Sequence, residues 1–184
     1  MRVIAGKARR LNLKTVPGLG TRPTTDRIKE TLFNILQPDI PGSSFLDLFA
    51  GSGGIGIEAL SRGAACCVFV DNDPKAVSVI RENLAFTRLD ADAQVLGLEV
   101  QRAISSLQGH APFTFIFMDP PYHKGLEPKV LELLYGSSLL DEETTVIIEA
   151  DLNTEFSWLG DAGYELVRTK TYKTNKHIFV MKRK

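Results

Sequence analysis

The stretch SFLDLFAGSGGIGIEALSRG, residues 44–63, decides the fold. A short apolar run leads through a glycine-rich loop into an amphipathic segment, which is the pattern of a β-strand that turns tightly into a helix. The glycines at positions 51, 53 and 56 allow the backbone to approach a bound molecule without interference from a Cβ atom. The stretch therefore predicts a strand, a loop and a helix with a ligand at the loop.

The same alternation continues along the chain. Further apolar runs at residues 67–71, 93–98, 113–119 and 144–150 predict strands, and amphipathic stretches at 74–86, 100–107 and 126–136 predict helices between them. The runs FTFIFM and TVIIEA lack polar alternation, as expected of parallel strands that are covered on both faces. The predicted class is α/β, doubly wound and Rossmann-like, with a mostly parallel sheet.

Both ends of the chain depart from this rhythm. YELVRTKTYK (164–173) and KHIFVMKRK (176–184) predict a closing antiparallel hairpin. At the other end, residues 2–16 predict a small basic hairpin, and TTDRIKETLFNIL predicts a helix that Thr24 or Thr25 caps and whose apolar face contains Ile28 and Leu32. We expect residues 1–40 to form an N-terminal appendage and residues 41–184 to form the main domain.

The charges are segregated although they cancel, with 22 Lys and Arg against 22 Asp and Glu. Residues 1–30 carry eight basic residues and two acidic ones, and residues 166–184 carry seven basic residues and no acid. If the two ends meet on one face, they form a positive patch that can neutralise phosphates. The alternative is that they are solvated termini.

Other classes of protein have little support in the composition. No apolar run approaches the roughly 20 residues that span a bilayer. The adjacent Cys66 and Cys67 have no distant partner, and the three histidines share no metal-ligand spacing with them. We expect a cytoplasmic, monomeric protein without a metal and without a membrane contact.

An acidic residue, Asp71, stands 20 residues after Gly51 at the end of the second expected strand. A Rossmann-type site has a carboxylate there that accepts hydrogen bonds from ribose hydroxyls. The spacing Gly51-x-Gly53-x-x-Gly56 also matches the dinucleotide fingerprint, so a nicotinamide or flavin enzyme remains open at this point. A merely structural role for Asp71 would be to cap the turn before Pro74.

The sequence Asp119-Pro120-Pro121-Tyr122 follows the fourth expected strand, at the edge where open α/β sheets bind ligands. Hydride transfer has no use for it. Methylation of an amino group does, because the lone pair of an exocyclic amine is delocalised into the ring and the nitrogen must be held in place. The Asp119 side chain and the Pro120 carbonyl can supply two acceptors, and Tyr122 can stack on an extruded base. A proline turn that happens to follow a strand is the alternative.

With these motifs the chain resembles the RsmD family of class I S-adenosylmethionine methyltransferases, which methylate N2 of a guanine in 16S ribosomal RNA. The motifs that carry the resemblance are RVIAGKARR, RPTTDRIKETLFNIL, DLFAGSGGIGIEALSRGA, VDNDPKAV and DPPY, and they span nearly the whole chain. The resemblance implies S-adenosylmethionine as cofactor and small-subunit RNA, naked or in an assembling subunit, as partner.

The resemblance also implies roles for individual residues. The expected cofactor-binding residues are Asp47, Phe49, Gly51, Gly53, Gly54, Asp71, Asn72 and Glu99. The expected catalytic residues are Asp119, Pro120, Pro121 and Tyr122. The expected RNA-binding residues are Arg9, Arg10, Arg22, Thr24 and Arg27.

The chain departs from the family pattern at two points. Glu99 replaces the usual Asp, and the C-terminal hairpin lacks the common Tyr-Gly turn. Four alternatives remain: an adenine-N6 or cytosine-N4 methyltransferase of DNA or RNA, a protein-glutamine methyltransferase, a nicotinamide oxidoreductase, and a non-catalytic RNA-binding module.

Overall fold

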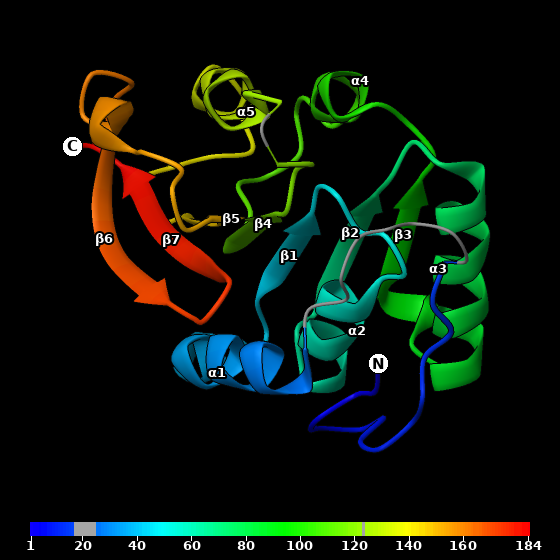
Figure 1. The fold of residues 1–184 in the computed structure, drawn as a ribbon. Helices are drawn as coiled ribbons and strands as arrows, with labels where there is room; N and C mark the ends of the chain where they lie inside the picture. The colour runs from blue at the N-terminus through cyan, green and yellow to red at the C-terminus, as the bar shows by residue number, and fades with distance from the viewer. Residues whose placement is uncertain (17–24, 123) are drawn as a thin grey trace.

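The computed structural model describes residues 1–16, 25–122 and 124–184. Its centre is a seven-stranded sheet in the order β3-β2-β1-β4-β5-β7-β6 (Figure 1). The first five strands are parallel, and β7 pairs antiparallel with both β5 and β6. The strands are β1 (Ser44–Asp47), β2 (Cys66–Val70), β3 (Ala93–Leu96), β4 (Phe115–Met118), β5 (Thr145–Asp151), β6 (Tyr164–Thr171) and β7 (Asn175–Lys182). The predicted fold class and the closing hairpin are confirmed.

Helices cover both faces of the sheet. Figure 1 shows α1 (Asp26–Leu36), α2 (Gly54–Ser61) and α3 (Pro74–Thr87) on one side, with α4 (Val100–Ser106) and α5 (Leu126–Tyr135) on the other. Short 3₁₀ turns cover Gln37–Asp39, Asp90–Asp92 and Ser157–Leu159. No helix in the described ranges is long and apolar enough to cross a membrane.

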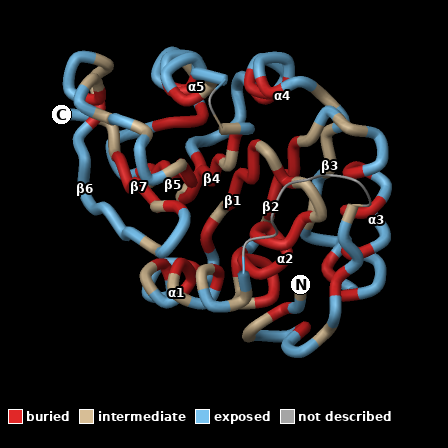
Figure 2. Tube along the Cα trace, in the orientation of Figure 1, coloured by how far each residue is buried: buried red, intermediate tan, exposed pale blue. Residues whose placement is uncertain are grey.

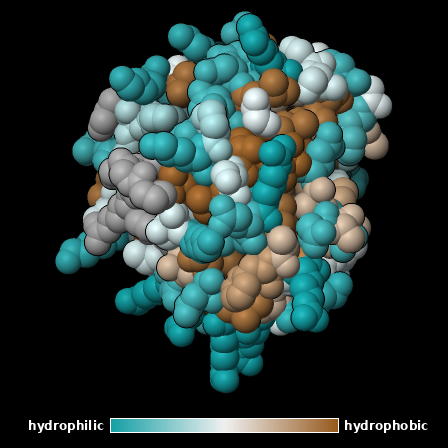
Figure 3. Space-filling view, turned by 90° about the vertical axis from the view of Figure 1, so that its right-hand side faces the viewer, coloured by the Kyte–Doolittle hydropathy of each residue, from teal (hydrophilic) through white to brown (hydrophobic). Residues whose placement is uncertain are grey.

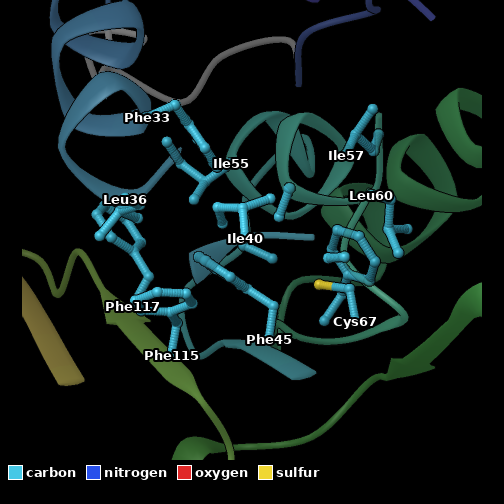
Figure 4. Packing of buried hydrophobic residues seen from close by; sticks show 14 of the residues in the cluster. Phe33, Leu36, Ile40, Phe45, Ile55, Ile57, Leu60, Cys67, Phe115 and Phe117 are labelled. Atoms are coloured by element: carbon cyan, nitrogen blue, oxygen red, sulfur yellow. The ribbon is translucent and has the colours of Figure 1, made fainter. Parts of the chain in front are cut away.

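Each face of the sheet packs its own hydrophobic cluster, so the central strands β1, β2, β4 and β5 are buried on both sides (Figure 2). The edge strand β6 is exposed apart from Tyr164. On the α1 side, Phe33 stacks on Phe45 with ring centroids 6.3 Å apart, and Phe115 lies 6.0 Å beyond Phe45. Figure 4 shows these rings together with Phe117 and the buried Cys67. Seen from the α3 side, hydrophobic residues form a band between hydrophilic ones (Figure 3).

The order of the strands determines where a ligand can bind. The chain builds outward from β1 to β3 in one direction and then returns to the other side of β1 with β4. In open α/β sheets such a reversal leaves a crevice at the carboxyl ends of the two central strands. Asp47 ends β1 and Asp119 follows β4, so both carboxylates lie at this crevice.

A buried ion-pair cluster joins the N-terminal segment to the core. The Lys29 ammonium lies 3.4 Å from the Glu58 carboxylate, both side chains are fully buried, and Arg62 forms a second ion pair with Glu58 at 2.8 Å. The same carboxylate accepts backbone hydrogen bonds from Ile4 and Ala5. Burial lowers the pKa of Lys29. The N-terminal segment is therefore bonded to α2 through one charged side chain.

The expected N-terminal elements differ in detail from the structure. Thr25 caps α1 by accepting from the Ile28 amide, as one of the two expected caps. The basic hairpin is minimal: one isolated antiparallel bridge joins Arg2 and Asn12. The buried face of α1 includes Lys29 as well as Leu32, because Glu58 compensates the lysine charge.

Glu58→Ala should lower the free energy of unfolding by about 3–5 kcal/mol, because it leaves a buried lysine without its counter-charge. Thermal or urea unfolding followed by circular dichroism would measure the loss. The matched control is Lys14→Ala, which removes an ion pair between two exposed side chains, Lys14 and Glu82, and should change the midpoint little. Equal losses in the two variants would contradict the role of the buried cluster.

Candidate active site

Two carboxylates hold the glycine loop at the crevice. Asp47 accepts a hydrogen bond from the Gly56 amide at 3.2 Å, and Asp71 accepts one from the Gly51 amide at 2.8 Å. Gly51 and Gly53 have φ angles of 55° and 80°, a backbone region that favours glycine. The loop therefore runs between the ends of β1 and β2 and begins α2 at the crevice.

A cavity of about 430 Å³ lies against this loop. Seven of the eight expected cofactor-binding residues line it, and they are Asp47, Phe49, Gly51, Gly54, Asp71, Asn72 and Glu99. Gly53 is the exception: it is the N-cap residue of α2, so its positive φ serves the turn into the helix. Within the described ranges, no three His, Cys, Asp or Glu side chains are grouped as metal ligands.

Asp47 is the most unusual group in this cavity. Its carboxylate is buried, and its Oδ1 atom has no hydrogen-bond partner among the described residues. Burial, reinforced by the charge of Asp71, raises its pKa from 3.8 to about 7, against the opposing backbone hydrogen bonds from Gly56 and Phe49. An unpaired buried acceptor is costly unless a ligand supplies a donor. The geometry therefore fits a cationic or hydrogen-bond-donating group beside Oδ1.

Asp71 and Glu99 lie at the tips of β2 and β3. The second oxygen of Asp71 accepts from the Asp73 amide at 2.9 Å, which fixes the carboxylate, and burial raises its pKa. The Asn72 side-chain amide donates to Glu99 at 2.6 Å. These three side chains form the acidic end of the cavity, where hydroxyl or amino donors of a ligand can bind.

Residues 119–122 contribute to this cavity and to a second one. Asp119 and Pro121 line the first cavity, whereas Tyr122 lines the second. Burial, with the charges of Glu149 and Asp47, raises the pKa of Asp119 well above its ordinary value. Pro120 is buried. The four expected catalytic residues thus lie where two cavities adjoin.

The second cavity has a volume of about 570 Å³. It lies between the first turns of α1, Tyr122, the end of β5 and the β6–β7 turn. Arg27, Lys170 and Lys173 are exposed on its rim, so basic residues from both ends of the sequence meet there. The sequence predicted Arg27 as an RNA-binding residue, whereas Lys170 and Lys173 were not predicted individually.

A buried polar cluster beside Tyr122 was also missed by sequence reasoning. Glu149 accepts a hydrogen bond from the Asn175 side-chain amide at 2.6 Å and is paired with His177 at 3.1 Å. The other nitrogen of His177 lies 3.1 Å from the Tyr172 hydroxyl. The one available signal was a carboxylate, Glu149, inside the apolar run TVIIEA.

The expected RNA-binding residues are distributed over different parts of the molecule. Arg9 and Arg10 are exposed on the N-terminal hairpin, and Arg27 is exposed on α1. Arg22 and Thr24 lie outside the described residues. Of these five, the structure brings Arg27 to the second cavity.

Comparison with known proteins identifies the family. The model of the family described as conserved hypothetical protein 95 matches residues 1–181. The chain belongs to this family. The resemblance to the RsmD family is thereby confirmed, because relatives with that name cover most of the chain.

Two relatives of the chain have names that state an activity. The chain is 41% identical over 174 residues to "Putative rRNA methyltransferase YlbH" of Bacillus subtilis, which covers 94% of both proteins. It is 36% identical over 152 residues to "Ribosomal RNA small subunit methyltransferase D" of Escherichia coli, which covers 83% of this chain and 75% of the relative.

Solved structures agree with this assignment. "Putative methyltransferase yhhF" from Escherichia coli is 33% identical to the chain and superposes with a TM-score of 0.84, covering 100% of this chain and 98% of the other. A putative methylase from Haemophilus influenzae, 28% identical, superposes with a TM-score of 0.82 over 100% of this chain and 99% of the other. The fold and the family therefore extend along the whole chain.

The raised pKa of Asp47 predicts a pH-dependent stability. Because the folded-state pKa of about 7 exceeds the ordinary 3.8, this carboxyl destabilises the fold progressively as the pH rises from about 4 through 7. Asp47→Asn should therefore stabilise the ligand-free protein at pH 8, by an amount on the order of a few kcal/mol, and have little effect near pH 4. Thermal melts across this range would measure the difference, and a pH-independent effect would contradict the account.

Proposed function

We propose that this protein transfers the methyl group of S-adenosylmethionine to the exocyclic N2 amine of a guanine in small-subunit (16S) ribosomal RNA. The observation that carries the proposal is that residues 119–122 contribute to two cavities, Asp119 and Pro121 to the first and Tyr122 to the second. A transferase with two large substrates needs two sites that share a few residues, because the reacting atoms must come within about 3–3.5 Å of each other. The names of the relatives support both the type of reaction and the RNA substrate.

The first cavity suits S-adenosylmethionine. The unpartnered Oδ1 atom of Asp47 can accept a hydrogen bond from the ammonium of the methionine part. Asp71 can accept from the ribose hydroxyls, and Glu99 from the adenine amino group, in a cleft that Phe49 also lines. When bound, this cofactor supplies a methyl group that its sulfonium has already activated.

The catalytic residues then hold the target nitrogen rather than act as strong bases. In our proposal the Asp119 carboxylate and the Pro120 carbonyl accept the two N–H bonds of the guanine amine. The nitrogen electron pair forms the new N–C bond, the C–S bond breaks, and its electron pair stays on sulfur. The two acceptors stabilise the positive charge on nitrogen, which afterwards releases one proton to water.

The second cavity and its surroundings suit a nucleotide within an RNA strand. Its rim carries Arg27, Lys170 and Lys173, which can bind phosphates, and Tyr122 offers an aromatic face for a base. We further propose that Arg9 and Arg10 extend this contact along the hairpin. The substrate would be naked 16S RNA or an assembling small subunit.

Asp119→Ala should reduce methyl transfer by about 100-fold or more, because it removes one of the two acceptors that hold the amine. The assay is transfer of radiolabelled methyl from S-adenosylmethionine to small-subunit RNA. Affinity for S-adenosylhomocysteine, measured by calorimetry, should change only a few-fold. Activity that survives this substitution would contradict the proposed clamp.

Charge reversal of Arg9 and Arg10 to Glu should weaken RNA binding and reduce its dependence on salt. The slope of the logarithm of the binding constant against the logarithm of the salt concentration should fall by about one for each phosphate that is no longer neutralised. The measurement is the RNA dissociation constant at several salt concentrations. The matched control reverses Arg102 and Lys129, which are exposed on α4 and α5 across the sheet. If both double variants have the same slope, the hairpin does not bind RNA.

A further inference from the structure

Glu149 lies beside Asp119 at the carboxyl edge of the sheet. In the parallel pairing of β4 with β5, Met118 is opposite Ile148. Asp119 directly follows the end of β4, and Glu149 is the next residue of β5. Phe117 and Ile147, two positions earlier, belong to the cluster on the α1 face. Because side chains alternate along a strand, Glu149 is directed to that same face. Its charge contributes to the raised pKa of Asp119, so the two carboxyl groups lie near each other. Neighbouring strands are about 4.8 Å apart, so the two acceptors are close neighbours.

Two side chains of β7 fix the orientation of the Glu149 side chain. His177 is its register partner across β5 and β7, and the Asn175 amide donates to its other oxygen. Tyr172 in turn lies within hydrogen-bond distance of His177. Side chains held by such a network keep one geometry, which is what recognition of a single base requires.

Glu149 also belongs to the second cavity. It lines that cavity with Tyr122, and its charge and its hydrogen bond to the tyrosine hydroxyl help to raise the pKa of Tyr122 after the larger effect of burial. The cavity volume of about 570 Å³ lies within the range of roughly 300–1,000 Å³ found for ligand pockets. A carboxylate, an aromatic ring and a basic rim together suit one nucleotide.

We infer that Glu149 determines which base the protein accepts, by accepting the ring N1–H of a guanine whose N2 amine is held by Asp119. This inference rests on the proposed function. The Watson–Crick edge of guanine presents two adjacent donors, N1–H and N2–H, and the two neighbouring carboxyl groups present only acceptors when both are ionised. Burial and the Glu149 charge raise the pKa of Asp119 in the ligand-free site, and the donors of a bound guanine favour the ionised form. Adenine and cytosine present an unprotonated ring nitrogen next to their amine, which would face a carboxylate and be repelled.

The test replaces the guanosine that the wild-type protein labels by 2-aminopurine riboside within the same RNA. This analogue keeps the amine at C2 but has an acceptor at N1. The wild-type protein should methylate it with a kcat/KM about 10–100-fold lower than guanosine, because the N1 atom then turns a lone pair, and no longer a donor, toward the Glu149 carboxylate. Comparable rates on the two RNAs would overturn the inference.

The substitution Glu149→Gln supplies a gain-of-function readout. Its amide oxygen can still accept from Asn175, and its NH2 group can donate both to His177 and to N1 of 2-aminopurine. The preference for guanosine over 2-aminopurine should therefore shrink by about 10-fold or more. 2-Aminopurine also lacks the oxygen at C6, and comparing the ratio of the two rates between wild-type protein and variant removes the effect of that difference. If the role of Glu149 were merely structural, the substitution would lower both rates and leave their ratio unchanged.

The outcomes separate the inference from the proposed function. No methyl transfer to guanosine by the wild-type protein would contradict the function itself. Transfer without discrimination against 2-aminopurine, or an unchanged ratio in an active Glu149→Gln variant, would contradict the role of Glu149 alone. If the variant does not fold, as judged by its melting and by S-adenosylhomocysteine binding, comparable rates of the wild-type protein on the two RNAs would still overturn the inference.

Discussion

The glycine loop can face a ligand only because Asp47 and Asp71 hold it from the ends of β1 and β2. Asp71 accepts from the loop amide of Gly51 at 2.8 Å, and Asp47 accepts from the amide of Gly56, in the first turn of α2, at 3.2 Å. These bonds fix the start of α2 and so the floor of the first cavity. The Oδ1 atom of Asp47 has no partner within the described residues, and burial raises the pKa of this acid. Asp47 therefore holds the start of α2 with one oxygen, and its other oxygen can accept a hydrogen bond from a ligand.

The two cavities differ in the charges of the residues that line them. The first contains Asp47, Asp71 and Glu99, a setting that favours a cationic ligand. The second has Arg27, Lys170 and Lys173 on its rim, which favours a polyanion. A sulfonium cofactor and an RNA strand carry these opposite charges, so the zero net charge of the chain hides two complementary sites. Asp119 lies between them, where the proposed transfer occurs.

The sequence predicted the elements and the first cavity well, for physical reasons. Strands covered on both faces leave continuous apolar runs, and Thr25 and the glycine loop have local signatures. Pairings between distant residues leave no such trace. The bond between Lys29 and Glu58 and the cluster around Glu149 depend on which strands become neighbours. A buried lysine in α1 and a carboxylate in β5 were visible as residues, but their partners were not.

The identity of the methylated nucleoside tests the central claim most directly. Small-subunit RNA, naked and in partly assembled particles, would be incubated with the protein and S-adenosylmethionine, digested to nucleosides and analysed by mass spectrometry. The account predicts N2-methylguanosine as the product. A methylated adenosine or cytidine, or methyl groups found only in DNA or protein, would contradict the match between the two carboxylates and the edge of guanine.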